Sequence, residues 1–88
     1  MTTKFIASDS HDIHHAIHLS VSYGQIVTVT LASGVDFDTA LTWVSQRSES
    51  YDYSDRNSDE ETGALIWDVW GDDGKGGEFR LFLVEAAS

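Results

Sequence analysis

All four histidines of the chain lie close together near its start: His11, His14, His15 and His18. In a helix they stand at positions i, i+3, i+4 and i+7, which places them on one face, roughly opposite the apolar residues of the same segment. Imidazoles four residues apart can share a metal ion, so the pairs His11/His15 and His14/His18 are candidate ligands. No Glu lies between them, unlike in the His-Glu-x-x-His pattern, so a hydrolytic zinc enzyme is not predicted.

Two other interpretations of the histidines stay open. They form an exposed polar face with incidental affinity for nickel or zinc, which is the preferred interpretation, or they sense pH. Protonation of all four would change the net charge from −10 to −6 around pH 6.5, where an unperturbed imidazole titrates. No metal or other cofactor is therefore predicted.

The charge of the chain is strongly negative. Its 88 residues include 15 Asp and Glu but only 5 Lys and Arg, giving a net charge of −10. Binding to DNA, RNA or anionic lipid requires a basic surface, so none of these is an expected direct partner. A basic protein surface is the expected one, because opposite charge speeds encounter.

Most of the negative charge lies in residues 49–73, which hold nine acids and one base, Arg56. Spaced carboxylates of this kind can occupy a groove that binds phosphates, and aromatic residues supply anchors for an interface. The alternative is a solvated segment that keeps a small protein soluble. The predicted partner-binding residues are Glu49, Tyr51, Asp52, Tyr53, Asp55, Asp59, Glu60, Glu61, Asp68, Trp70, Asp72 and Asp73.

The motifs that would indicate ion binding, phosphate binding or catalysis are incomplete. Residues 55–59 match the first half of a calcium loop, but Glu60 stands where Gly is needed and Ile66 where Glu is needed. Residues 74–77 lack the Lys-Ser/Thr pair of a phosphate loop and are typical of a hairpin turn. No Gly-x-Ser-x-Gly elbow occurs. The chain is therefore not predicted to be an enzyme.

The elements that must position these residues follow from spacing. Residues 4–7 and 25–32 read as strands. Apolar spacing after His11, caps at residues 8–10 and a stop at Gly24 predict a helix over 11–23, although alternation over 17–23 leaves a hairpin as the rival. Asp36 caps a second helix with Phe37, Ala40, Leu41 and Val44 on one stripe. Residues 48–63 are predicted to be a long acidic loop, and residues 64–70 and 78–85 two strands.

The predicted fold is a single α+β domain over residues 1–88, in the order β-α-β-α-β-β. The sheet is expected to be antiparallel or mixed, with two helices packed on one face. Alternate residues 65, 67 and 69 and residues 79, 81 and 83 are core candidates. Asp68 is placed on the solvent face rather than in a carboxylate pair of raised pKa. Trp43 falls off the helical stripe and is a candidate surface anchor.

The sequence says less about the cellular compartment and the oligomeric state of the protein. There is no Cys, which excludes a disulfide framework and suits a reducing cytoplasm. No apolar run is long enough to span a membrane, and residues 1–7 lack the apolar region of a signal peptide. An exposed Trp43 or Trp70 would leave room for a homodimer, so monomer and homodimer both stay open.

The chain resembles a class of small phage-encoded proteins. The resemblance rests on an acidic domain without Cys, on the phrase Tyr23-Gly24-Gln25-Ile26-Val27-Thr28-Val29 and on the hairpin Trp67-Asp68-Val69-Trp70-Gly71-Asp72-Asp73-Gly74. Anti-CRISPR proteins are such a group, and several resemble nucleic acid in charge and occupy basic channels of Cas effector complexes. They share no common signature, so no residue role is carried over.

The function expected from these observations is a non-enzymatic inhibitor that binds the basic nucleic-acid-binding surface of a CRISPR-Cas complex in the cytoplasm of a bacterial host, with mimicry of nucleic acid as one mode of binding. One alternative is a small phage or plasmid structural or adaptor protein. Another is a metal-binding protein built on the histidine face.

Overall fold

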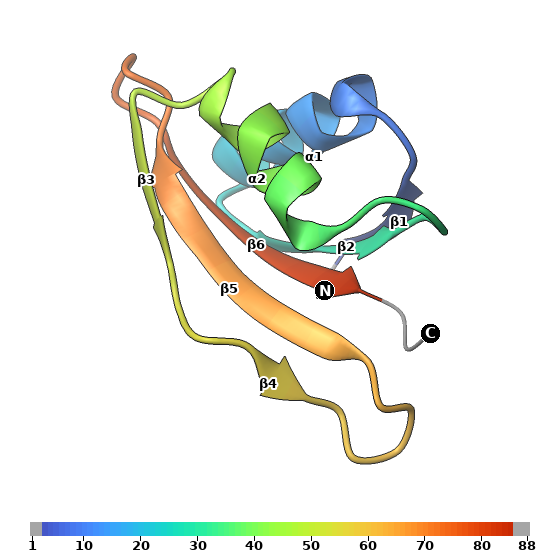
Figure 1. Cartoon of the computed structure of the whole chain (residues 1–88). Helices are drawn as coiled ribbons and strands as arrows, with labels where there is room; N and C mark the ends of the chain where they lie inside the picture. Colours follow the sequence, from blue (N-terminus) through green and yellow to red (C-terminus); the bar gives the residue numbers. More distant parts are fainter. Residues whose placement is uncertain (1–2, 86–88) are drawn as a thin grey trace.

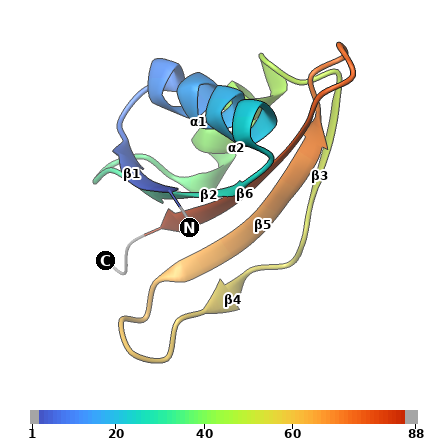
Figure 2. The same ribbon diagram turned by 180° about the vertical axis from the view of Figure 1, so that it is seen from behind.

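Two helices pack on one face of a mixed β-sheet in the computed structural model, which describes residues 3–85 (Figures 1 and 2). The helices are α1 (Ser10–Tyr23) and α2 (Phe37–Ser45). The strands are β1 (Thr3–Ala7), β2 (Ile26–Leu31), β3 (Ser50–Tyr53), β4 (Asn57–Ser58), β5 (Leu65–Asp72) and β6 (Glu78–Glu85). The α+β class, the mixed sheet and the helices on one face are confirmed. Neither helix is long and apolar enough to cross a membrane.

The order of the strands across the sheet is β1-β2-β6-β5-β3, with β4 also pairing with β5. Strands β1, β2 and β6 run parallel, and β5 runs antiparallel to β6, β3 and β4. Parallel neighbours need a crossover, which α1 supplies between β1 and β2. The last strand of the chain therefore lies at the centre of the sheet, and β3 and β4 form an edge (Figure 1).

Local capping explains where the helices begin and end. The Asp9 carboxylate accepts a hydrogen bond from the Asp12 N–H at 3.0 Å, and α1 ends at Gly24, whose φ of 62° is left-handed. The Asp36 carboxylate accepts from the Thr39 N–H at 2.8 Å and starts α2. The helix predicted over 11–23 is thus confirmed, and the rival hairpin is wrong.

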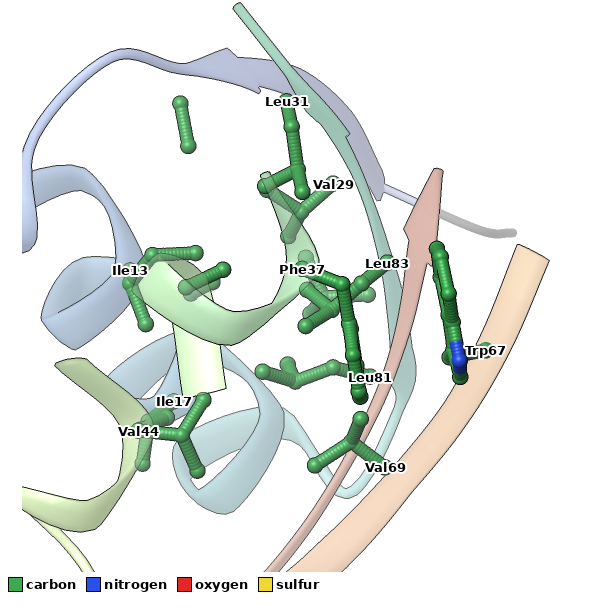
Figure 3. Close-up of a cluster of buried hydrophobic side chains, with 14 of the residues drawn as sticks. Ile13, Ile17, Val29, Leu31, Phe37, Val44, Trp67, Val69, Leu81 and Leu83 are labelled. Carbon is green, nitrogen blue, oxygen red and sulfur yellow. The ribbon is translucent and has the colours of Figure 1, made fainter. Parts of the chain in front are cut away.

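The core lies between the helices and the covered face of the sheet (Figure 3). The alternate residues predicted for β5 and β6 point into it, together with one stripe from each helix. The buried apolar side chains include Ile13, Ile17, Val29, Leu31, Phe37, Val44, Trp67, Val69, Leu81 and Leu83. Phe37 stacks on Trp67 with ring centroids 4.1 Å apart, which fastens α2 to β5. Trp43, predicted as a surface anchor, is instead half-buried against this core.

The prediction of a loop over residues 48–63 was wrong in part, because β3 and β4 lie inside it. Edge strands need no aliphatic side chains, since they are held by backbone hydrogen bonds to one neighbour. Gly71 on β5 makes the pairing possible: a Cβ there would meet the Ser50 carbonyl oxygen and come within 2.9 Å of the Phe79 ring.

Candidate protein-binding surface

The face of the sheet opposite the helices carries three rows of side chains, defined by the strand register. One row is Ile26, Arg80, Trp70 and Asp52; the next holds Thr28, Phe82 and Asp68; the third is Ile6, Thr30, Val84, Ile66 and Asn57. No helix of residues 3–85 packs on this face (Figures 1 and 2). It is named here the open face.

The open face carries several apolar side chains, although a sheet face in contact with solvent is usually polar. Ile6 is 68% exposed and Trp70 is 40% exposed, while Ile66, Phe82 and Val84 are half-buried. Sequence reasoning did not single out Ile6, Ile66, Phe82 or Val84. The signal was present in the nearly continuous apolar runs of residues 64–70 and 79–84, because a strand with one solvated face alternates. Exposed apolar patches often mark interaction sites.

An ion pair lies in the middle of the open face. The Asp68 carboxylate accepts hydrogen bonds from Arg80 Nε at 3.0 Å and from Arg80 Nη2 at 2.7 Å. These bonds and the negative charge of Asp68 raise the pKa of Arg80 above its ordinary value. The guanidinium also lies 5.6 Å from the centroid of the Phe82 ring. Asp68 therefore sits on the solvent side of β5, as predicted, and its charge is balanced.

Four of the twelve predicted partner-binding residues share the open face, namely Asp52, Asp68, Trp70 and Asp72. Asp72 is fixed in position, since its carboxylate accepts from the Ser50 hydroxyl at 2.8 Å and from the Gly74 N–H at 3.0 Å. Asp52 is exposed and accepts from the Tyr53 N–H. This part of the prediction therefore forms one surface, in which Trp70 is the large exposed aromatic group.

Four other predicted acids follow the edge of the sheet beyond β3: Asp55, Asp59, Glu60 and Glu61. Asp55 lies in the connection between β3 and β4, and the other three lie in the turn between β4 and β5. Asp59 orders that turn by accepting from the Glu61 N–H at 2.8 Å. With Asp52, these acids lie on or next to β3 and β4, the strands outside β5, and are named here the acidic edge; all but the half-buried Asp59 are exposed.

The remaining four predicted residues point to the helix side of the sheet. Tyr51 and Tyr53 have the same orientation on β3 as the buried Val69 and Phe79 have on their strands, by register. The Tyr53 ring meets Phe37 edge-on at 5.3 Å, which gives it a packing role. Glu49 and Asp73 line a groove beside α1. The segment is therefore divided between two sides of the molecule.

That groove contains all four histidines, on the side of α1 nearest the turn between β5 and β6. It has a volume of about 580 Å³ and is also lined by Arg47, Glu49, Asp73 and Lys75. His14 Nε2–H donates to the Trp43 carbonyl oxygen at 3.0 Å, which joins α1 to α2. The N–H groups of Lys75 and Gly77 donate to Asp73 and lower the pKa of its carboxyl.

Apart from the histidine pairs four residues apart, the histidine groove provides no set of ligands for a metal ion among the described residues. Within residues 3–85, no three His, Asp or Glu side chains are grouped so that they could hold a metal ion. The groove mixes acids with bases, so charges partly cancel there. The metal-binding alternative depends on the spacing of the histidines alone.

A second and larger hollow, of about 760 Å³, opens beside Trp70 at the end of the open face. Its lining includes Ile26, Asp52, Asp72, Glu78 and Arg80 from the open face, and also Ser20, Tyr51 and Phe79 from the helix side of the sheet. The hollow lies where the β5–β6 hairpin extends past the start of β2. It brings an exposed indole next to Asp72, two residues further along the same strand, and next to Asp52, which only the pairing of β3 with β5 places there.

Comparison with known proteins gives no relative from which a role could be transferred: no protein-family model, no curated protein and no solved structure matches the chain.

Proposed function

We propose that this protein is a non-enzymatic inhibitor that binds a basic nucleic-acid-binding surface of a bacterial defence complex, such as a CRISPR-Cas effector, in the cytoplasm of the host cell. The observation that carries the proposal is the acidic edge beside an apolar, helix-free sheet face. Carboxylates repel nucleic acid and attract the lysines and arginines that bind it, while Trp70 and its apolar neighbours add contact area.

Charge distribution supports a binding role over simple solubility. Residues 49–73 hold nine acids and one base, whereas the remaining residues hold six acids and four bases. A solubility device needs a net charge of roughly 2–8, with no preferred location. Here five of the nine acids, Asp52, Asp55, Asp59, Glu60 and Glu61, follow one edge of the sheet together with the one base, Arg56, and all of these acids but Asp59 are exposed. Such an arrangement favours fast, salt-sensitive association with a basic groove.

The experiment that tests this function is a pull-down from bacterial lysates, with CRISPR-Cas-expressing strains among the sources and with washes at low and high salt. We expect retention of one nucleic-acid-binding complex that high salt releases and that its own guide or target nucleic acid displaces. The same complex, purified, should lose nucleic-acid binding when the protein is added. Retention of its own copies alone, or of proteins that resist salt and nucleic acid, would contradict the proposal.

A structural or adaptor protein is the second candidate, and the open face is the observation that favours it. Ile6, Ile66, Phe82 and Val84 together give an apolar surface that an assembly contact could cover. Salt separates the two functions, because an apolar assembly contact withstands salt that releases an electrostatic one.

A further inference from the structure

We propose that the hollow beside Trp70 binds an arginine side chain of the partner protein, with the guanidinium stacked on the indole and hydrogen-bonded to the surrounding carboxylates. This assignment rests on the proposed function and deepens it, because it names the group by which a basic partner is recognised. The occupant is an arginine on a protein surface, and the other occupants are outcomes of the test below.

The hollow is built by strand register. Trp70 on β5 stands between Arg80 on β6 and Asp52 on β3, and the next row along brings Glu78 opposite Asp72. All these side chains point to the open face and line the same hollow of about 760 Å³. An indole that is 40% exposed therefore has carboxylates beside it in the same row and in the next one.

The chain's own arginine does not fill this position. Arg80 is drawn toward Asp68 by two hydrogen bonds of 3.0 and 2.7 Å, and its guanidinium lies over Phe82. Asp68 and Phe82 form the row on the side away from Glu78 and Asp72. Among the side chains of residues 6–85, none places a cation over the indole of Trp70. The ring thus has Asp52 on one side and Arg80 on the other, but the guanidinium of Arg80 is held at Asp68 and over Phe82 rather than over the indole.

The charges of the hollow favour a cation over any other ligand. Asp52, Asp72 and Glu78 contribute three carboxylates, while the charge of Arg80 is balanced by Asp68. Asp72 is held by Ser50 and Gly74, so one carboxylate is fixed before binding. No hydrogen bond or ion pair to another described residue engages the side chain of Glu78, which leaves it available to a ligand.

Arginine fits this chemistry better than lysine does. Its planar guanidinium stacks on an aromatic face and donates two parallel hydrogen bonds to a carboxylate at the same time, whereas an ammonium is a strongly hydrated point charge. A second copy of this chain is a poorer occupant, because each copy carries a net charge of −10 and the two repel. A basic protein surface has the complementary charge.

The test uses three blocked tripeptides, Gly-Arg-Gly, Gly-Lys-Gly and Gly-citrulline-Gly, titrated into the ¹⁵N-labelled full chain. The indole N–H signals of Trp43, Trp67 and Trp70 are followed by NMR and assigned with Trp70→Leu. We expect the arginine peptide to shift the Trp70 signal saturably, the lysine peptide to bind at least about threefold more weakly, and the uncharged citrulline peptide to cause no saturable shift.

Two variants separate the hollow from general negative charge. Asp52→Asn/Glu78→Gln should weaken the arginine peptide about tenfold or more, whereas Glu60→Gln/Glu61→Gln, with the same net charge, should change its affinity less than about twofold. Equal binding of the arginine and citrulline peptides, equal loss in both variants, or shifts at Trp43 instead of Trp70 would overturn the assignment. So would a Trp70 shift that depends on protein concentration alone, because a second copy would then be the occupant.

The outcomes keep this inference distinct from the proposed function. If the arginine peptide leaves Trp70 unchanged while a nucleic-acid-binding complex is still retained through the acidic edge, only the hollow is assigned wrongly. If the peptide binds as expected while lysates yield no such complex, the hollow stands as an arginine site and the proposed function is wrong.

Discussion

The two faces of the sheet are built from the same strands but have different surroundings. On the covered face, Val29, Val69, Leu81 and Leu83 have no exposed surface at all, because α1 and α2 pack over them. On the open face, apolar side chains are half-buried or exposed, and an ion pair takes the central position. The covered face therefore has the features of a core, whereas the open face keeps apolar side chains in contact with solvent.

The difference also separates stability from function. Residues of the covered face should control the free energy of unfolding, whereas residues of the open face and the acidic edge should control binding. A substitution on the covered face that changed only binding, or one on the open face that changed only stability, would contradict this division. The expected effects below run from the largest to the smallest.

Leu81 and Ile66 give a matched pair across the sheet. Leu81→Ala removes a fully buried side chain and should destabilise the fold by about 2–5 kcal/mol. Ile66→Ala shortens a half-buried side chain of the open face and should cost about 1 kcal/mol. Urea unfolding of both variants measures the difference. Equal losses would mean that the open face is part of the core.

Ser20 is the buried polar group of the covered side. Its hydroxyl donates to the Gln25 carbonyl oxygen at 2.7 Å and accepts from the Arg80 N–H at 2.8 Å, so it ties the end of α1 to β6. Ser20→Ala leaves both backbone groups without this partner and should destabilise the protein by about 1–3 kcal/mol. Ser22→Ala, at an exposed position of the same helix, is the control and should stay near wild type. Urea midpoints that coincide for the two variants would rule out the structural role of Ser20.

Acid should remove the stabilisation that the Asp36 cap gives to α2. The Thr39 N–H donates to Asp36 and lowers the pKa of this carboxyl below its ordinary 3.8. The pKa of Asp36 is lower in the folded state than in the unfolded state. The cap therefore stabilises the fold fully above the unfolded-state pKa, and this stabilisation is lost as pH falls through the folded-state pKa.

Asp36→Ala should therefore lower the urea midpoint at pH 6 by less than Ser20→Ala does, and should reduce the fall in stability between pH 5 and pH 2. Asp38→Ala, which removes an exposed acid of the same turn without removing the cap, is the control. A pH dependence of Asp36→Ala that matches wild type would contradict the cap's contribution.

The ion pair of the open face should contribute least to stability. Arg80 is half exposed, with 50% of its side-chain surface accessible, so solvent screens its attraction to Asp68. Asp68→Asn should leave the urea midpoint nearly unchanged. It should nevertheless release the guanidinium toward Trp70 and weaken the arginine peptide by competition, measured in the same NMR titration. A large loss of stability would place this pair in the core instead.

The sequence predicted those parts of the fold that depend on local signals. Caps at Asp9 and Asp36, the stop at Gly24 and the alternating residues of β5 and β6 all have the roles expected of them. The edge strands could not be predicted, because β3 and β4 are held by backbone pairing to β5 rather than by apolar side chains. Tyr51 and Tyr53 show the consequence, since their side of the sheet depends on that register.

The candidate site was predictable in composition but not in arrangement. Charge counting found the acidic segment, yet it could not separate Asp52 and Asp72 on the open face from Glu49 and Asp73 in the histidine groove. Glu78, which lies outside the segment, joins Trp70 through the pairing of β5 and β6. The turn predicted at residues 74–77 indicated that β5 and β6 pair, whereas the pairing of β3 with β5, which brings Asp52 to Trp70, has no signal in the spacing along the chain.

The most direct test of the central claim compares two variants of equal net charge. The edge variant is Asp55→Asn/Glu60→Gln/Glu61→Gln, which leaves the hollow beside Trp70 intact; the control variant, Ser22→Lys/Ser33→Lys/Asp38→Asn, changes exposed residues elsewhere. Each is added to the captured complex, and displacement of its fluorescent nucleic acid is measured. We predict that the edge variant needs at least about tenfold more protein than wild type and the control variant less than about threefold. Equal losses in the two variants would show that total charge, and not the acidic edge, determines binding, and would contradict the account.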